Sequence, residues 1–550
     1  MACKEYIEEI KKIIDGDISA EEKVISEYSR DTSLFKVPPL AVVFPKNTED
    51  IKKLINFASL KKQEGGNISL TARSAGTDMT GGPLSESIIL GFTKYFNRIK
   101  EIGHDYAVVE PGVFYRNFEK ETLKYNLLLP CYPASRELCA IGGMIANNSG
   151  GEKTLTYGKI EKYVKELKMV LSDGNEYSFF ALTLKELNEK KKLKTFEGDL
   201  YKKMFKLIDE NYDLLQKAKP RVAKNSAGYS LWNVYDKENG TFDITKLIVG
   251  SQGTLGIVTE ARLKLIKPKK SSRLLIVMLN DMAPLAQVIN KILKYKPDSF
   301  ESYDDHTFKV AIKFFPLILK RLSGNMVRLA LDLLPEFFMF LTGGVPKMVL
   351  IVEFTGENDE EALAKAVKAQ RGLEIFGLKT KVTKTEREAK KFWTFRRESF
   401  NLLRQHMKKL RTAPFIEDIS VCPEVLPEFL PKLNNLLNKY NIIYTVTGHV
   451  GDGNFHIIPL MDFSDPETIS IIKNLSEDVY KLVIEYKGSI TGEHNDGLIR
   501  TPYLPMMYGK EVCGLFEKVK DIFDPQGIFN PRKKVRGGLD YAIEHIDKDR

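Results

Sequence analysis

Cysteine is scarce in this sequence of 550 residues, and the few cysteines that occur are scattered, with no Cys-x-x-Cys pair. The five are Cys3, Cys131, Cys139, Cys422 and Cys513. This distribution argues against a disulfide framework, a thiolate zinc site and a bound iron–sulfur cluster. Redox chemistry in this chain therefore needs a group other than cysteine.

Long uninterrupted apolar runs are also missing. The first residues, MACKEYIEEIKKIID, carry Lys4 and Glu8 where a secretion signal needs apolar residues, which favours the cytoplasm. Residues 309–345 alternate apolar clusters with basic residues, and prolines such as Pro316 interrupt them too often for a span of about 20 apolar residues. Two helices packed on a domain explain this stretch; a peripheral contact with the inner face of a membrane, or with a partner, stays open.

The net charge of +10 comes from lysines spread along the chain and from short runs such as NEKKKLK at 188–194. No basic-aromatic platform or nucleic-acid motif accompanies these charges, so we expect a solvated surface and no nucleic-acid partner. The length exceeds what one hydrophobic core supports, and 43% of the residues are apolar. The sequence therefore predicts an ordinary globular protein of two or three domains.

The apolar patterns predict where these domains begin and end. LAVVFP at 40–45 predicts a buried strand, and NTEDIKKLINFASLKK at 47–62 predicts a helix with an asparagine or threonine cap. Short strand signals continue to EARLKLIK, and PKKSS then has the composition of a linker. Strands SRLLIVML and KMVLIVEF and the helical stretch DEEALAKAVKAQRG follow. We expect an N-terminal helical segment at 1–35, a first domain at 36–268, a second α+β domain at 269–480, and a C-terminal helical return at 481–550.

Three segments of the first domain are rich in glycine. They are ARSAGTDMTGG at 72–82, CAIGGMIANNSGG at 139–151 and VGSQGTLGIVTEA at 249–261. Small residues and consecutive amides suit a loop that wraps a phosphate through backbone N–H groups. None of the three is a G-x-G-x-x-G motif or a P-loop, which disfavours a Rossmann site and an NTPase. Each alone is best explained as a turn, but together they favour an extended cofactor that carries phosphate.

Three of the seven histidines occur in two motifs, VTGHVGDGNFHIIPL at 446–460 and ITGEHNDGLIR at 490–500. The Asp-Gly pair at 452–453 predicts a two-residue type I′ hairpin turn, which sets His449 opposite His456 on one face. Two imidazoles and a carboxylate form a recurrent catalytic metal set, and Glu493 is the nearest carboxylate candidate. Hydrogen-bonded polar packing is the simpler alternative for a histidine pair.

Several ordered motifs make the chain resemble a known flavoenzyme family over most of its length, from Pro39 to Lys533. The motifs are RSAGTDMTGG, EPGVFY, AIGGMIANNSGG, YGKIEKYV, GSQGTLGIVTEA, FWTFRRES, GHVGDGNFH, GEHNDGLIR and FDPQGIFNPRK. They are similar to those of the family of bacterial D-lactate dehydrogenase, the glycolate oxidase catalytic subunit and D-2-hydroxyglutarate dehydrogenase. The resemblance implies an α+β fold: a two-part FAD domain of the vanillyl-alcohol-oxidase (PCMH) type, a cap domain for the substrate, and a C-terminal helical return to the flavin.

The resemblance also implies which residues bind FAD. Thr77 stands where relatives with covalent flavin carry a histidine, so non-covalent FAD is expected. The implied FAD-binding residues are Arg73, Ser74, Ala75, Gly76, Thr77, Thr80, Gly81, Pro133, Gly142, Gly143, Ala146, Asn147, Asn148, Gly150, Ile257, Val258 and Asn530.

In the second domain, the resemblance implies that a divalent metal is bound by His449, His456 and Glu493. Zinc is the first candidate for this metal, and manganese and iron are alternatives. His494 matches the general base, and Arg396 matches the arginine that binds the substrate carboxylate. The implied reaction is oxidation of a 2-hydroxy acid, D-configured where chiral, such as D-lactate or glycolate. A hydride would pass to flavin N5, and the electrons to a quinone, an electron-transfer flavoprotein or an iron–sulfur protein. The chain could also form a homodimer, which the sequence neither indicates nor excludes.

Some positions depart from the family pattern. Asn495 replaces a usual glycine, Gln252 replaces a glutamate, and Asp78 is an acid within the first glycine-rich segment. Ile416 falls where hydroxyglutarate enzymes place a lysine, which disfavours hydroxyglutarate as substrate. Two alternatives remain: a flavoenzyme of another reaction on the same fold, such as an ether-lipid synthase, and a non-catalytic flavin subunit of a larger redox complex.

Overall fold

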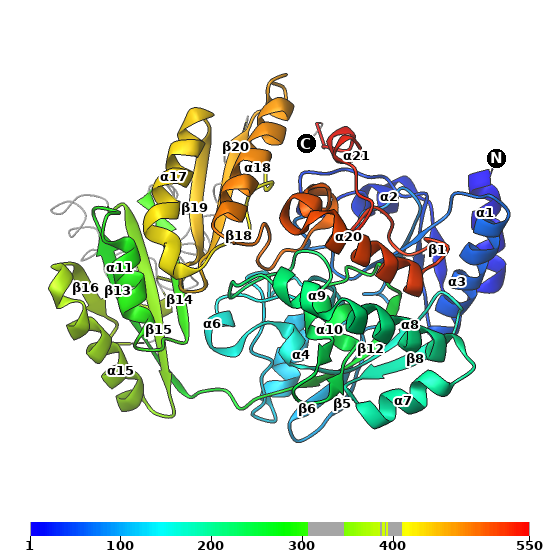
Figure 1. Cartoon of the computed structure of the whole chain (residues 1–550), viewed down its shortest axis with the longest axis horizontal. Helices are drawn as coiled ribbons and strands as arrows, with labels where there is room; N and C mark the ends of the chain where they lie inside the picture. Colours follow the sequence, from blue (N-terminus) through cyan, green and yellow to red (C-terminus); the bar gives the residue numbers. More distant parts are fainter. Residues whose placement is uncertain (1, 306–345, 386–387, 391, 394–409, 549–550) are drawn as a thin grey trace.

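The computed structural model describes residues 2–305, 346–385, 388–390, 392–393 and 410–548 (Figure 1). They form two lobes of mixed helix and strand. The first lobe holds the chain up to residue 264 together with the C-terminal helices, and the second holds the strands and helices between residues 271 and 485. The α+β fold class is thereby confirmed. The domain limits given above stay predictions.

The first lobe contains three sheets. The four-stranded sheet has the order β1 (Asp17–Ser19), β2 (Ala41–Phe44), β4 (Ile88–Gly91), β3 (Leu70–Arg73). The five-stranded sheet has the order β5 (Ile99–Ile102), β6 (Tyr106–Val109), β12 (Ile257–Lys264), β7 (Val164–Val170), β8 (Glu176–Phe180). A small sheet joins β10 (Tyr235–Asp236), β11 (Thr241–Phe242) and β9 (Leu182–Thr183).

Local sequence explains the opening β-α unit. The predicted strand is β2, and the predicted helix is α3 (Thr48–Gln63), which follows it. Asn47 caps this helix, because its side chain accepts a hydrogen bond from the amide of Asp50 at 3.0 Å. The apolar face of α3 is buried through Ile51, Leu54 and Ile55. Both expectations from the sequence are confirmed. In the preceding segment, β1 lies between α1 (Ala2–Ile13) and α2 (Glu22–Tyr28) in the chain. It pairs with β2.

The second lobe is built on an eight-stranded sheet. Its path is β16 (Lys379–Val382), β13 (Ser271–Leu279), β15 (Met348–Gly356), β14 (Ser299–Asp304), β19 (Ile443–His449), β20 (Asn454–Met461), β17 (Arg411–Thr412), and β18 (Ile419–Ser420) also pairs with β20. Its helices are α11 (Leu285–Leu293), α15 (Asp359–Gly372), α17 (Leu426–Lys439) and α18 (Thr468–Glu485). The strands predicted from SRLLIVML and KMVLIVEF are β13 and β15, and the predicted helix is α15.

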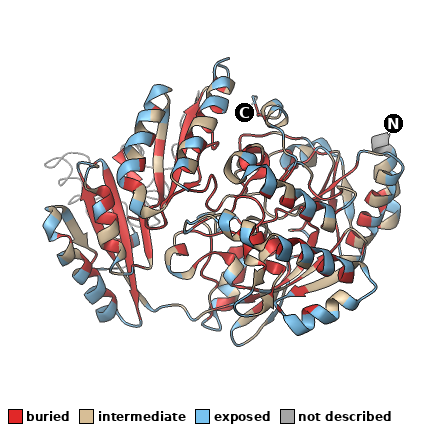
Figure 2. Cartoon of the chain, viewed as in Figure 1, coloured by how far each residue is buried: buried red, intermediate tan, exposed pale blue. Residues whose placement is uncertain are grey.

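Burial explains why these strands are apolar on both faces. Leu275 and Val277 of β13 belong to the core that packs against the helices, whereas Leu274 and Ile276 belong to a smaller core on the other face. Figure 2 shows the strands of this sheet as buried and the outer faces of its helices as exposed.

The C-terminal return to the first lobe is confirmed. Helix α20 (Leu504–Phe523) packs on α8 (Phe196–Glu210) and α9 (Tyr212–Ala218), and α21 (Leu539–Glu544) follows it. Backbone bonds tie the return to β3, since the amide of Leu70 donates to the carbonyl of Ile528 at 2.7 Å and the amide of Asn530 donates to that of Leu70 at 3.0 Å. None of the described helices combines the length with the apolar character that a membrane span requires. The stretch 309–345 lies outside the described residues.

Candidate functional site

The three glycine-rich segments meet around one cavity in the first lobe. Part of the predicted FAD-binding set lines it: Arg73, Ser74, Ala75, Gly76, Thr77, Gly142, Gly143, Ala146, Asn147 and Val258. Sequence reasoning missed further lining residues, among them Pro111, Met169 and Ser251. The cavity thus joins segments that are far apart in the chain.

The other residues of that set lie outside the cavity lining. Thr80, Gly81, Asn148, Ile257 and Asn530 are buried in the surrounding structure. The side-chain amide of Asn530 donates to the carbonyls of Gly82 at 2.9 Å and Gln252 at 2.7 Å, so it holds two lining residues in place. Pro133 is half-buried in a loop, and Gly150 lies instead against Glu493, whose Oε2 is 3.4 Å from where a Cβ on Gly150 would stand.

The second glycine-rich segment is a short helix rather than a loop. Helix α5 (Ile141–Asn147) forms because Ile141, Met144 and Ile145 share one buried face. A Cβ added to Gly142 would lie 2.6 Å from the Cβ of Pro111, whereas one added to Gly143 would meet no atom within 4 Å. The helix can therefore approach its neighbours closely and leaves open space beside Gly143, which suits a bound planar cofactor.

Asp78 satisfies backbone amides of the first glycine-rich segment. Its Oδ2 accepts from the amides of Thr80 at 2.9 Å and Gly82 at 2.8 Å, and its Oδ1 accepts from the side chain of Asn147 at 2.6 Å. The carboxylate is thus a cap that shapes the turn, which explains how an acid is accommodated in this segment.

The histidine hairpin forms with a longer turn than predicted. Residues Val450–Asp452 make a turn of 3₁₀ helix, and only Gly453 of the predicted pair has a positive φ, 66°. The pairing is therefore His449 with Asn454, and His456 with Thr447, so the predicted register was wrong by two residues. A shift of two keeps every side chain on its face. The two imidazoles still meet, diagonally, with ring centroids 5.2 Å apart.

Three imidazoles converge on one carboxylate oxygen. Nε2 lies 3.1 Å from Glu493 Oε1 in His449, 3.5 Å in His456 and 3.6 Å in His494. The His456 and His494 rings stack at 5.0 Å. His449 and His456 are buried, whereas the side chain of His494 is 26% exposed and so is open to a small molecule. Arg396 lies outside the described residues.

Each imidazole is held through its other nitrogen by a residue that sequence reasoning missed. Nδ1 of His449 lies 2.5 Å from Glu301 Oε1, and Nδ1 of His494 lies 2.6 Å from Glu417 Oε2. Nδ1 of His456 donates to the backbone carbonyl of Glu417 at 2.9 Å. Such partners orient histidine ligands and fix their tautomers. The available signal was the pair of acids inside the apolar stretch FIEDIS, which is buried throughout.

Buried cations balance these carboxylates. Nζ of the fully buried Lys224 donates to Glu493 Oε2 at 2.9 Å and lies 3.5 Å from Asp452. The guanidinium of Arg500 pairs with Glu417 Oε1. Despite burial, Lys224 and His449 hold the pKa of Glu493 well below its ordinary value. The carboxylate is therefore charged, as a metal ligand must be.

His449 and His494 differ from free imidazole in their proton affinity. Burial lowers the pKa of His449, but the carboxylates of Glu301 and Glu493 together outweigh this and raise it to about 9. For His494, burial is outweighed by Glu417 and Asp418, and the pKa rises to about 10. Both values belong to the chain without a cation, so in that state both rings carry a positive charge at neutral pH.

Asn495 connects the imidazole cluster to the cavity. Its φ of 75° places it in the left-handed region, which asparagine tolerates. Its side-chain amide donates to the carbonyls of Gly250 at 2.9 Å and Asn147 at 3.3 Å. Since Asn147 lines the cavity, the segment that carries His494 is fastened directly to the predicted flavin site.

Two family models match the chain: an FAD binding domain at residues 39–179, and the C-terminal domain of FAD linked oxidases at residues 268–534. A D-2-hydroxyglutarate dehydrogenase of Escherichia coli (strain K12) is 28% identical over 540 residues, covering 94% of this chain and 50% of the relative. Glycolate oxidase subunit GlcD of Bacillus subtilis (strain 168) is 27% identical over 519 residues, covering 92% of this chain and 91% of the relative.

Among solved structures, the 4-ethylphenol oxidase from Gulosibacter chungangensis has the same fold, with a TM-score of 0.67 at 17% identity over 98% of both chains. The two family models define the class of the protein: an FAD binding domain followed by the C-terminal domain of FAD linked oxidases. More particularly, these two domains make the chain an FAD-linked oxidoreductase. It spans about half the length of the D-2-hydroxyglutarate dehydrogenases of Escherichia coli and Pseudomonas putida to which it is similar.

Proposed function

We propose that this chain is an FAD- and divalent-metal-dependent dehydrogenase of a small 2-hydroxy acid, such as D-lactate or glycolate. One observation carries the proposal: three imidazole Nε2 atoms converge on one carboxylate oxygen, beside a cavity lined by FAD-domain segments. The relatives named for 2-hydroxy acids support the substrate class. Ile416, a fully buried apolar residue, speaks against a second carboxylate on the substrate, because it supplies no positive charge.

The proposed metal ligands are His449, His456 and Glu493. The described residues contain a second group of potential ligands, formed by Glu417, Asp418, His456 and His494. In that second group the oxygens already have donors, since Asp418 Oδ2 accepts from the amides of Glu493 at 2.9 Å and His494 at 2.8 Å. The first group has two Nε2 atoms aimed at a charged carboxylate, with every Nδ1 engaged. Imidazole and carboxylate ligands suit zinc, and also manganese or iron.

His494 is the proposed general base. Its Nδ1 is engaged by Glu417, so Nε2 is the nitrogen that can take the proton of the substrate hydroxyl. When bound, a divalent metal polarises that hydroxyl and lowers its pKa. Positive charge beside the ring also lowers the pKa of His494 from the value of about 10 that it has without a cation. The ring is then neutral before it accepts the proton.

FAD, when bound, supplies the hydride acceptor. The cavity suits it, because helix α5 packs closely at Gly142 and leaves open space beside Gly143. We propose non-covalent binding, since Thr77 has no nitrogen with which to attach the flavin. Arg396 is the proposed anchor of the substrate carboxylate. The electrons pass to a separate acceptor of the quinone, flavoprotein or iron–sulfur class.

The test is anaerobic stopped-flow bleaching of the flavin by a panel of D- and L-2-hydroxy acids, with FAD and metal content measured alongside. We expect one enantiomer to bleach the flavin and chelation to abolish the reaction. Replacing His494 by alanine should leave FAD bound and slow bleaching by about a hundredfold or more. His104→Ala is the matched control, because the His104 side chain is 90% exposed. Absence of bleaching by every acid, with FAD and metal bound, would refute the proposal.

Replacing His456 tests the ligand set separately. Because its Nε2 is one of only three proposed ligand atoms, His456→Ala should empty the metal site while FAD stays bound. One equivalent of tightly bound metal in that variant would contradict the assignment.

A further inference from the structure

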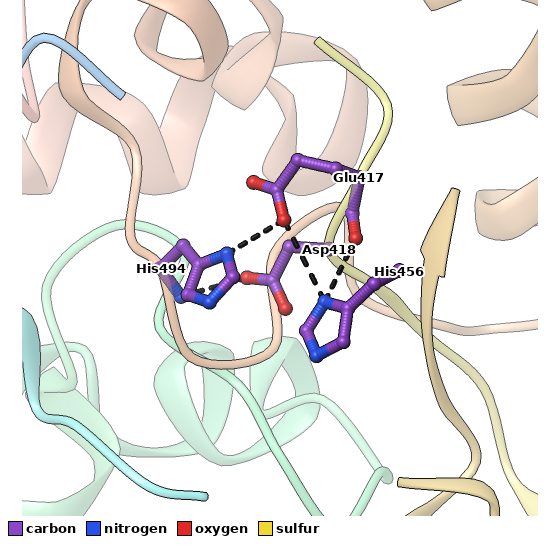
Figure 3. Close-up of side chains that lie close together, drawn as sticks. All are labelled: Glu417, Asp418, His456 and His494. Carbon is purple, nitrogen blue, oxygen red and sulfur yellow. Dashed lines mark hydrogen bonds and ion pairs between the residues drawn. The ribbon is translucent and has the colours of Figure 1, made fainter. Parts of the chain in front are cut away.

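Glu417 lies between two of the three imidazoles and touches both. Its carboxylate Oε2 is 2.6 Å from Nδ1 of His494 and 3.6 Å from Nδ1 of His456. Its backbone carbonyl accepts from the same nitrogen of His456 at 2.9 Å. Figure 3 shows this arrangement, with the carboxylate above the gap between the two rings. A single residue thus contacts a proposed metal ligand and the proposed base.

The position of Glu417 is itself fixed from several sides. Its other oxygen, Oε1, pairs with Arg500, and both side chains are fully buried. Arg500 in turn donates to the carbonyl of Asn495 at 3.0 Å, which closes a ring of contacts back to the segment of His494. The side chain of Asn454, next to the hairpin turn, donates to Asp418 Oδ1 and to the carbonyl of Ile419, each at 3.0 Å. The carboxylate therefore has no freedom to leave the rings.

These contacts determine where the protons of the neutral rings sit. A carboxylate only accepts hydrogen bonds, so Nδ1 of His494 must carry the hydrogen in this pair. The carbonyl of Glu417 imposes the same choice on His456. Each ring is then left with a bare Nε2 facing Glu493, which is the form that binds a metal or accepts a proton.

We propose that Glu417 is a positioning residue that sets the tautomer of His494 through its carboxylate and that of His456 through its backbone carbonyl. The inference rests on the proposed function, in which His494 is the base. The side chain and the backbone carbonyl of Glu417 therefore have separate roles. A change of side chain affects His494, whereas the backbone carbonyl continues to accept from His456 and orients it for the metal.

Glu417→Gln is the informative variant, because it keeps the shape and removes one acceptor. The amide has a single oxygen, and the buried guanidinium of Arg500 requires it. Its NH₂ group then faces Nδ1 of His494 and favours the tautomer with the hydrogen on Nε2, which cannot act as a base. Loss of the correct tautomer is a large effect where a buried carboxylate orients a catalytic histidine.

The holoenzyme variants are compared in three measurements. We expect Glu417→Gln to retain FAD, to bind Zn²⁺ within about threefold of the wild type in chelator competition, and to lower the limiting rate of flavin reduction about a hundredfold at unchanged substrate Kd. Glu417→Asp keeps both acceptors and should restore part of that rate. Glu424→Gln, at an exposed position seven residues away, is the matched control and should behave as wild type.

The tautomer is measured directly, without substrate. The chain has only seven histidines, so ¹⁵N-histidine-labelled holoenzyme gives few ring signals, and His494→Ala identifies the one that matters. We expect hydrogen on Nδ1 of His494 in the wild type and on Nε2 in Glu417→Gln. The same tautomer in both proteins, or an unchanged reduction rate, overturns the inference. If Glu417→Gln does not fold, Glu417→Asp with the wild-type tautomer and a partly lowered reduction rate supports it, and Glu417→Asp with the opposite tautomer overturns it.

Failure of the proposed function has a different signature. In that case no 2-hydroxy acid bleaches the wild-type flavin, yet the tautomer of His494 still changes between the wild type and Glu417→Gln. That result would support the positioning role of Glu417 and contradict the reaction proposed for the site.

Discussion

Removing the charge of Lys224 should destabilise the metal-free protein strongly. Its side chain is fully buried, and its Nζ lies 2.9 Å from Glu493 Oε2 and 3.5 Å from Asp452. Burial raises the pKa of Asp452, and Lys224 is the nearest cation that opposes this effect. The substitution Lys224→Met keeps the unbranched side chain except for its terminal ammonium and leaves both carboxylates without that cation.

The size of the effect follows from these distances. At an effective dielectric constant of about 20, the pair at 2.9 Å attracts by roughly 6 kcal/mol before the cost of burying both charges. Removing one partner of such a buried pair costs about 3–5 kcal/mol in free energy of unfolding. For a chain of 550 residues that unfolds as one unit, this corresponds to a fall of about 3–4 °C in Tm.

The assay is thermal unfolding of the metal-free protein, repeated with Zn²⁺. We expect Lys224→Met to lower the Tm of the metal-free protein by about 3–4 °C. Zn²⁺ should recover part of this loss, because a cation bound at Glu493 again opposes the buried negative charge. Lys432→Met is the matched control. Lys432 pairs with Glu485, but the two side chains are 52% and 59% exposed, so losing this pair should lower the free energy of unfolding by only about 0–1 kcal/mol. A Tm for Lys224→Met within about 1 °C of the wild type would refute the electrostatic argument.

Two further predictions concern the metal and the cavity. Because the pKa of His449 is raised to about 9 without a cation, its proton stabilises the metal-free fold fully below pH 6.5, and that stabilisation disappears as pH rises through 9. A metal at this ring must displace the proton, so its affinity should rise at least about tenfold per pH unit from neutrality towards pH 9, and more steeply where His494 also releases its proton; chelator competition that shows no pH dependence would contradict this. Gly142→Ala places a Cβ 2.6 Å from that of Pro111, so it should cost about 1–3 kcal/mol and weaken FAD retention. Gly143→Ala, whose Cβ meets nothing within 4 Å, should leave the melting of the apoprotein unchanged; equal melting of both variants would disprove the packing argument.

Local signals in the sequence were sufficient for the elements whose structure is decided locally. The cap of α3 at Asn47 and the apolar face of that helix are encoded in Asn47 and the sixteen helical residues that follow it, and the structure has both. The hairpin of His449 and His456 was predicted in kind but not in register. A two-residue turn requires positive φ at Asp452 as well, and the chain instead makes a 3₁₀ turn before Gly453. The alternation of side chains survived, because the shift was an even number of residues.

The partners of the imidazoles were beyond the reach of local signals. Glu301 lies 148 residues from His449, and Lys224 lies 269 residues from Glu493. Each is a charged residue in a strand or loop that sequence patterns treat as surface, and its burial follows only from how the sheet and the returning chain meet. Ile416 was noted because a family comparison points to it, while its neighbour Glu417 was passed over although it makes the contacts.

On the proposed function, protons and a metal would compete for the same face of the cluster. Without a cation, His449 and His494 take protons because Glu301, Glu417 and Glu493 surround them with negative charge that Lys224 and Arg500 offset only in part. On the proposed function, a divalent cation at Nε2 of His449 supplies that charge instead. The proton on His494 is then no longer required for balance, so the same carboxylates that make the empty site acidic leave the loaded site with a base. The raised pKa of His494 thus agrees with its proposed role, because a bound metal would turn this histidine from a proton donor into a proton acceptor.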